Sequence, residues 1–388
     1  MAASNAPVKP LRVAIHKTVL AVHRWTGLTV GLVLAFMAAT GILLAYRTRL
    51  EPLVYRDLLT APACADRIPL DTLAAKAHAA HPDGELDYVR IKGAKGGSVP
   101  ATQVRVSGPG SQDDVFFDPC TGALLGERGR YGGFFGATES LHKMHFVKNG
   151  WIITGSAALI FVFVLAIAGI YLWWPRRLCG LKTALKLNPR LGGCERTLNR
   201  HKVVGVYAAA VLTLMALTGL PQAFDWYQAG IYNLLHSPKP KKPQSAPGSG
   251  PRASMETYWR HVQSLVPNPA ETLIHFPSKS RDPVEIFVIG PDAPHANART
   301  MLFLDAFSDQ VLRFTPYAQS SPGHKAYFWT LSLHTGQVGG WFGPLVLITG
   351  ALAMLTLAYT GIGSFLRRRL KKMNAISGSV QHRFTKAA

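Results

Sequence analysis

The stretch Val22–Ala45, VHRWTGLTVGLVLAFMAATGILLA, decides the fold of this 388-residue chain. From Trp25 to Tyr46 the sequence holds no charged residue over 22 positions, which is long enough for a helix to cross a bilayer. A histidine, His23, stands at the entrance of this run with Arg24 beside it. The sequence therefore predicts a membrane-spanning helix that carries an ionisable side chain at one end.

The same pattern returns at Asn199–Ala223, NRHKVVGVYAAAVLTLMALTGLPQA. A shift of 178 residues places His23 on His201 without a gap. The same shift aligns Gly27 with Gly205, Leu34 with Leu212, Met37 with Met215, Thr40 with Thr218 and Gly41 with Gly219. Such agreement predicts an internal duplication, in which each half supplies one histidine at the same membrane depth.

Two later segments are related in the same way. A shift of 192 residues places His142 on His334 and the Arg pair at 176–177 on the pair at 368–369. Uncharged runs cover Trp25–Tyr46, Trp151–Trp174, Val203–Phe224 and Trp341–Leu366. Each exceeds the roughly 18 residues that a spanning helix requires, so the order span, external module, span is predicted twice.

The charge pattern supports a membrane protein. Only 16% of the residues are charged, against about 25% in average globular chains. The formal net charge is +21, but the basic residues crowd the ends of the apolar runs. We therefore attribute the charge to membrane orientation, with both termini cytoplasmic, and expect membrane lipid and no nucleic acid as a partner.

The predicted fold class is a mainly α membrane protein with four transmembrane helices and two small external α+β modules. The first half comprises a cytoplasmic tail (1–13), span one (14–47), module one (50–140), a Leu-His segment with span two (141–175) and a basic cytoplasmic loop (176–198). The second half comprises span three (199–225), module two with a Pro- and Lys-rich linker (226–332), a Leu-His segment with span four (333–366) and a basic cytoplasmic tail (367–388).

Repeated local patterns define the modules. Helices are predicted over Leu70–Pro82 and Met255–Pro267, and strands over Gln103–Val106, Asp114–Phe117 and Met301–Asp305. Cys64 and Cys120 fall in module one, where a disulfide would persist outside the cell. Cys179 and Cys194 fall in the cytoplasmic loop and lack a CxxC metal spacing. The sequence leaves open whether the first pair is bonded, because it carries no geometry.

Four histidines at duplicated positions carry the predicted chemistry. His23 and His201 share a cytoplasmic-side depth, and His142 and His334 share an external-side depth. Two neutral imidazoles that face each other across a helix bundle suit the axial ligation of haem iron. Each pair is therefore a candidate haem site, and Arg24, Arg200 and Lys202 are candidate partners of the propionates.

Alternative interpretations remain open at this point. Zinc requires about four N or S ligands, and no Cys or carboxylate repeats beside these histidines. A proton relay is expected to place Asp or Glu within the apolar runs of the spans, and the four uncharged runs hold none. On the external side, His145 lies one turn from His142 and competes with it as a ligand, although its counterpart is Gln337. For the basic residues, the positive-inside rule is an equal explanation.

The chain resembles the PepSY-associated transmembrane family through four features: HRWTGLTVGLVLAFMAATG, the SLH segment before the second span, the WWPRR exit and the FFDPCTG turn. It is most similar to the iron-uptake branch, the di-haem inner-membrane siderophore reductases. The resemblance implies four spans and two b-type haems held by His23, His201, His142 and His334. It also implies modules in the periplasm. In module two, Asp305–Asp309 stands where the family favours a D-P-x-T-G turn.

The function implied is the reduction of an external ferric siderophore, with Fe(III) converted to Fe(II). No nucleotide-binding glycine motif occurs in a suitable context, so electrons are expected from a cytoplasmic or quinol donor. One alternative is a transmembrane b-type cytochrome that relays electrons to another acceptor. Another is a non-enzymatic regulator of a periplasmic protease, which leaves the four histidines unexplained.

Overall fold

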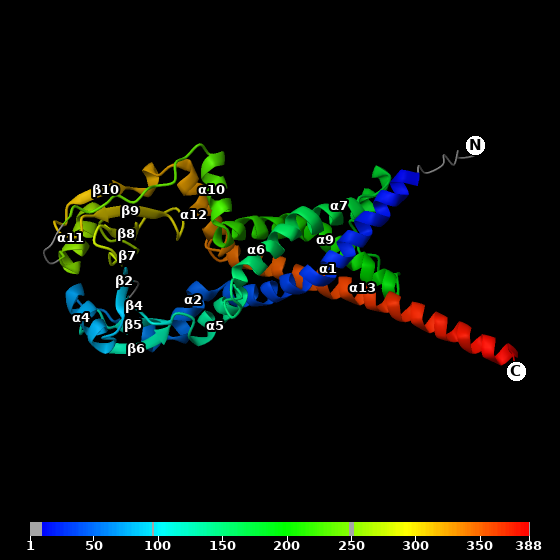
Figure 1. Cartoon of the computed structure of the whole chain (residues 1–388), viewed down its shortest axis with the longest axis horizontal. Helices are drawn as coiled ribbons and strands as arrows, with labels where there is room; N and C mark the ends of the chain where they lie inside the picture. The colour runs from blue at the N-terminus through cyan, green and yellow to red at the C-terminus, as the bar shows by residue number, and fades with distance from the viewer. Residues whose placement is uncertain (1–9, 95–96, 248–251, 388) are drawn as a thin grey trace. The chain divides into compact units, whose positions relative to one another are not determined.

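The computed structural model describes residues 10–94, 97–247 and 252–387, and the chain divides into two compact units (Figure 1). The membrane unit contains the chain up to Ala45, Leu141–Ala223 and the part from Pro344 onward. The sheet unit contains Tyr46–Ser140 and Phe224–Gly343. Residues 1–9 of the predicted tail and 248–251 of the predicted linker lie outside the described residues.

Within the described residues, four helices are long and apolar enough to span a membrane, as the sequence predicted. They are α1 (Pro10–Leu44), α6 (Gly150–Ile160) continued through the π-helical turn η1 (Phe161–Ala166) into α7 (Ile167–Trp173), α9 (Gly193–Ala223) and α13 (Phe342–Ala387). The shortest apolar segment has 24 residues, or about 36 Å at 1.5 Å per residue. Leu34, Phe161, Leu212 and Met354 belong to the core between these helices.

Shorter helices connect the spans and border the sheet. They are α2 (Arg47–Val54), α3 (Arg56–Leu59), α4 (Leu70–Ala80), α5 (Gly133–His142), η2 (Leu178–Gly180), α8 (Leu181–Ala184), α10 (Asp225–Leu234), α11 (Met255–Leu265), η3 (Tyr317–Gln319) and α12 (Pro322–His334). Two of them end at histidines that the sequence pairs, α5 at His142 and α12 at His334.

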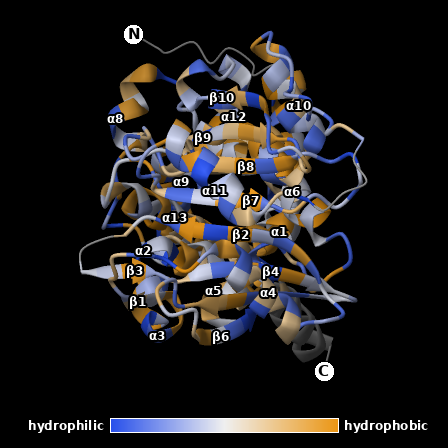
Figure 2. Ribbon diagram, turned by 90° about the vertical axis from the view of Figure 1, so that its left-hand side faces the viewer, coloured by the Kyte–Doolittle hydropathy of each residue, from blue (hydrophilic) through white to orange (hydrophobic). Residues whose placement is uncertain are grey.

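The strands of both predicted modules form one antiparallel sheet. Its order is β10-β9-β8-β7-β2-β4-β5-β6. Figure 2 labels β10, β9, β8, β7, β2, β4 and β6 of this sheet from top to bottom. The strands are β2 (Glu85–Lys92), β4 (Thr102–Gly108), β5 (Ser111–Phe117), β6 (Leu124–Gly129), β7 (Glu271–His275), β8 (Val284–Ile289), β9 (Arg299–Leu304) and β10 (Val311–Thr315). A separate pair joins β1 (Thr60–Pro62) and β3 (Ser98–Pro100).

The two halves of the sheet meet where β2 pairs with β7, with Val89 opposite Ile274. Both residues belong to a continuous core that also contains Leu73 of α4 and Val262 of α11. Alternation of apolar residues along each strand directs one face of the sheet toward these two helices. The sequence prediction of two modules did not include this pairing.

Helices α4 and α11 also cap each other. Both carboxylate oxygens of Asp71 accept hydrogen bonds from the α11 amides of Met255 (2.8 Å) and Glu256 (3.1 Å). The side chain of Glu256 in turn accepts a bond from the amide of Leu70, at 3.1 Å. The first amides of a helix lack partners within the helix, and carboxylates there are stabilising. The two halves thus complete each other's helix termini.

Cys64 and Cys120 form a disulfide, with 5.9 Å between their Cα atoms. The bond ties the segment before α4 to the turn at Asp118. In this turn Asp118 Oδ1 accepts from the amides of Cys120 (2.7 Å) and Thr121 (3.3 Å), and Gly122 has a φ of 67°. The question that the sequence left open is answered in favour of a bond.

The sequence departure at Asp305–Asp309 preserves the same kind of turn. Asp305 Oδ1 accepts from the amides of Phe307 (3.0 Å) and Ser308 (2.9 Å). Asp309 occupies the place of Gly122 and adopts a φ of 57°. The left-handed region is costly for residues that carry a Cβ, although Asp tolerates it better than most.

Replacing Asp309 with glycine should therefore raise the free energy of unfolding by up to about 1 kcal/mol. The substitution removes an ion pair with His261 at 3.5 Å, but a partly exposed pair of this kind contributes little. The measurement is thermal unfolding of the full-length protein in detergent. Asp309→Ala is the matched control, because it loses the ion pair and keeps the backbone strain. Equal stability of the two variants would contradict this explanation.

Candidate functional site

A cavity of about 600 Å³ lies within the membrane unit. Its walls come from all four spans and are mostly apolar, including Leu34, Phe161, Leu212 and Leu357. His23 of α1 and His201 of α9 both line it. The two histidines that the sequence paired across 178 positions therefore reach the same cavity.

The imidazole rings of His23 and His201 face each other. Their centroids are 6.2 Å apart, and the ring planes are inclined at 79°. Each ring lies against a glycine of a neighbouring span. A Cβ atom at Gly169 would stand 3.4 Å from His23 Cε1, and one at Gly361 would stand 3.5 Å from His201 Cε1. The two glycines allow the rings to pack closely against the helix backbones.

A threonine fixes the protonation of His201. The Thr360 hydroxyl donates to the carbonyl of Thr356 at 2.6 Å, and it lies 3.0 Å from His201 Nδ1. A hydroxyl has one proton to donate, so Thr360 Oγ1 must accept the Nδ1 proton of His201. In the neutral ring, Nε2 then keeps a free lone pair, which is the form that binds a metal ion.

The same arrangement recurs at His142. The Thr40 hydroxyl lies 3.0 Å from the carbonyl of Phe36 and 2.9 Å from His142 Nδ1. A Cβ atom at Gly41 would stand 3.5 Å from His142 Cε1. His142 is half-buried, whereas the competing candidate His145 is exposed. His142 thus shares with His201 a threonine at Nδ1 and a glycine beside Cε1.

His23 differs from both. Its Nδ1 atom is buried and has no hydrogen-bond partner. At the position equivalent to Thr360 the chain has Ala168. The π-helical turn Phe161–Ala166 contains Leu165, and such turns often mark functional sites.

Cationic side chains also line the cavity. They are Arg24, Lys202, Arg368 and Arg369. Arg24 and Lys202 were expected there, whereas Arg200 is not among the lining residues and is exposed. Arg368 and Arg369 were interpreted in the sequence only as a signal of membrane orientation. The net result is an apolar cavity with positive charge among its lining groups.

His334 ends α12 in the sheet unit, whereas His142 belongs to the membrane unit. The pairing of these two residues stays a prediction from the sequence. Among the described residues, no group of three or more His, Cys, Asp or Glu side chains could hold a metal ion. His23 and His201 can thus bind an ion on two sides, but they lack the further protein ligands that zinc requires.

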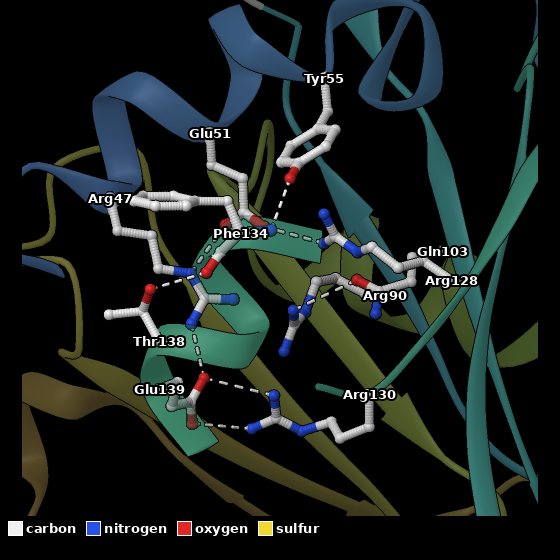
Figure 3. Close-up of polar contacts among 10 residues, drawn as sticks. All are labelled: Arg47, Glu51, Tyr55, Arg90, Gln103, Arg128, Arg130, Phe134, Thr138 and Glu139. Atoms are coloured by element: carbon white, nitrogen blue, oxygen red, sulfur yellow. Dashed lines mark hydrogen bonds and ion pairs between the residues drawn. The ribbon is translucent and has the colours of Figure 1, made fainter. Parts of the chain in front are cut away.

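Charged contacts hold α5 in the sheet unit (Figure 3). Arg47 donates to Glu51 at 2.8 Å and also to Glu139 of α5. Arg130 donates to Glu139 at 3.2 Å. The amide of Phe134, near the start of α5, donates to the Tyr55 hydroxyl at 2.7 Å. The sequence analysis missed this network, whose only local signal is the i,i+4 spacing of Arg47 and Glu51.

Comparison with known proteins agrees with the sequence resemblance at family level. The family model of the PepSY-associated TM region matches residues 20–368. This range includes the whole sheet, most of each span and every residue that lines the cavity except Arg369. None of the curated proteins matches the chain.

Proposed function

The chain belongs to the PepSY-associated transmembrane family, and we propose that it is a di-haem reductase that carries electrons across a membrane to a ferric siderophore. The observation that carries the proposal is the pair His23 and His201, facing each other across an apolar cavity at 6.2 Å between ring centroids. We propose that this cavity lies in the cytoplasmic half of a bacterial inner membrane, with the orientation taken from the positive-inside rule.

The residues present fit haem. His23 and His201 would hold its iron from two sides of the cavity, where their ring centroids are 6.2 Å apart. The group brings its own ring nitrogens, so the pair would need no further protein ligand. A cavity of about 600 Å³ with apolar walls suits a large planar ligand.

Each side chain has a defined task in this proposal. His23 and His201 would hold the iron, and Thr360 would keep the Nε2 lone pair of His201 available to it. Arg24 and Lys202 can pair with the propionates, while the apolar helix walls exclude water. When bound, haem supplies one-electron chemistry. His142 and His334 are proposed to hold the second haem on the periplasmic side.

The reaction transfers one electron to the Fe(III) of an external chelate and converts it to Fe(II). Hard oxygen donors bind Fe(II) less tightly, so the metal can leave the siderophore. The electron comes from a cytoplasmic or quinol donor. The alternatives are relay to another acceptor and a non-enzymatic role in regulating a periplasmic protease.

Stopped-flow reoxidation tests the proposal. Protein reduced with dithionite and freed of excess reductant is mixed anaerobically with a panel of ferric siderophores. We expect at least one of them to reoxidise the haems faster than buffer alone. If none does, while a quinone or a protein acceptor does, the reductase proposal fails and the relay takes its place. A purified protein without haem absorbance would overturn both.

A substitution at Thr360 tests the role of its hydroxyl. Thr360→Val keeps the shape but removes the acceptor for His201 Nδ1, and outer-shell changes of this kind typically lower metal affinity about 10–100-fold. We expect weaker retention of one haem during dilution in the presence of apomyoglobin. Ala168→Thr is the matched variant, because it offers His23 the acceptor that it lacks, and it should strengthen retention. Unchanged retention in both variants would show that these contacts do not tune the site.

A further inference from the structure

The end of α12 is held by a buried polar cluster that none of the preceding functions uses. Ser332, two residues before His334, is 0% exposed, and His295 of the loop between β8 and β9 is 5% exposed. His295 Nδ1 lies 2.8 Å from Ser332 Oγ, and His295 Nε2 lies 2.8 Å from the Tyr317 hydroxyl. The ring of Trp329 packs on His295 with 4.6 Å between centroids.

Asn297 extends this cluster past His334. Its side-chain amide donates to Ser332 Oγ at 2.9 Å and to Gln337 Oε1 at 3.4 Å. The backbone amide of Gln337 donates to the Ser332 carbonyl at 2.8 Å. The same short loop therefore fixes residues on both sides of His334 in the sequence.

The hydrogen-bond directions are consistent with a neutral His295. Ser332 Oγ accepts from the side-chain amide of Asn297, so the Ser332 hydroxyl proton is free to point at His295 Nδ1. His295 Nδ1 also accepts from the backbone amide of Asn297 at 3.3 Å. His295 Nε2 must then carry the ring proton and donate to Tyr317. Burial lowers the pKa of His295, which favours this neutral form. Every polar atom of the imidazole is satisfied, and such a network specifies one arrangement.

The helix related to α12 is held by different chemistry. In α5, Glu139 is bound by Arg47 and Arg130 (Figure 3). The position equivalent to Glu139 in α12 is Leu331, next to Ser332. Ionic contacts thus hold the helix of His142, and a neutral histidine network holds the helix of His334.

We propose that His295 is a positioning residue for His334: through Ser332 and Asn297 it fixes the last turn of α12 and the direction of the His334 imidazole. The inference rests on the proposed haem function. In this proposal the His295 network positions His334, and the ionic contacts of Glu139 position His142. A change at His295 should therefore disturb His334 and leave His142 unchanged. Preorganisation of a ligand by residues behind it is a general feature of metal sites.

The test compares His295→Ala with His324→Ala in the full-length protein. His324 is equally buried, at 3% exposure, but lies near the start of α12 and contacts the Arg299 carbonyl. We expect His295→Ala to shift the midpoint potential and the low-spin EPR signal of one haem and to leave the other unchanged. His324→Ala should shift neither signal. In His295→Asn the side-chain amide oxygen can still accept from the Ser332 hydroxyl, so this variant should show a smaller shift than His295→Ala.

A second measurement does not depend on haem. Hydrogen exchange of the haem-free protein should become faster at residues 331–335 in His295→Ala and stay unchanged there in His324→Ala. If His295→Ala fails to fold, Ser332→Ala serves in its place. This substitution removes the contact between Ser332 Oγ and His295 Nδ1 and leaves a smaller cavity, because a hydroxyl is smaller than an imidazole. A folded variant with both haem signals and the exchange rates of the wild type would overturn the proposal. Wild-type protein without haem would instead refute the proposed function, while the exchange result still decides whether His295 fixes α12.

Discussion

Purified His23→Ala protein is expected to contain one haem per chain where the wild type contains two. The ring centroids of His23 and His201 are 6.2 Å apart within one cavity, and removal of either imidazole would leave the proposed haem with a single protein ligand there. His201→Ala should give the same result. The measurement is the ratio of haem to protein from the pyridine haemochrome spectrum.

The matched control is His78→Ala, an exposed histidine in α4, which should retain two haems. His142→Ala and His334→Ala should each remove the other haem, so the remaining EPR signal must differ from that of the His23 variant. A ratio of two in the His201→Ala protein would contradict the ligand assignment at the cavity. A ratio of two in the His142→Ala protein would move the external ligand to His145 or elsewhere.

The second large effect concerns the disulfide between Cys64 and Cys120. The two residues are 56 positions apart, and a cross-link that closes a loop of this length restricts the unfolded chain by about 4 kcal/mol. The double variant Cys64→Ser with Cys120→Ser should therefore be less stable by about 2–4 kcal/mol. Thermal unfolding of the sheet unit within the full-length protein, followed by circular dichroism, measures the change.

Cys179→Ser provides the control for that experiment, because Cys179 is a free and exposed cysteine. Its unfolding temperature should match that of the wild type. Reduction of the wild type with dithiothreitol should reproduce the loss seen in the double serine variant. If reduction and double substitution both leave the unfolding temperature unchanged, the disulfide has no part in the stability of the sheet unit.

The sequence predicted those features that depend on composition and on local repetition. The four spans follow from long apolar runs, and α4 and α11 follow from periodic segments with acidic residues near their starts. The equal depth of His23 and His201 was predicted from their equal spacing in two helices of similar sequence, and both residues line one cavity. None of these predictions required knowledge of contacts between distant segments.

Contacts between distant segments were the part that could not be predicted. Thr360 lies 159 positions from His201, and nothing in its local sequence distinguishes it from other span threonines. The pairing of β2 with β7 depends on which strand edges meet, and strand patterns do not specify that. Arg200 was expected near the cavity with Lys202, but successive helix residues point in different directions, and only Lys202 lines it.

The seam between β2 and β7 has a consequence for stoichiometry. A strand edge without a neighbour presents unpaired amide and carbonyl groups, and it readily recruits another chain. If the two sheet halves were separate polypeptides, the seam would form only at sufficient protein concentration, and two copies of one half could join in the wrong combination. Covalent linkage makes the encounter intramolecular, with an effective concentration that dilution does not change. The joined chain thus guarantees one partner of each kind, so the two helices that end at His142 and His334 are always supplied together.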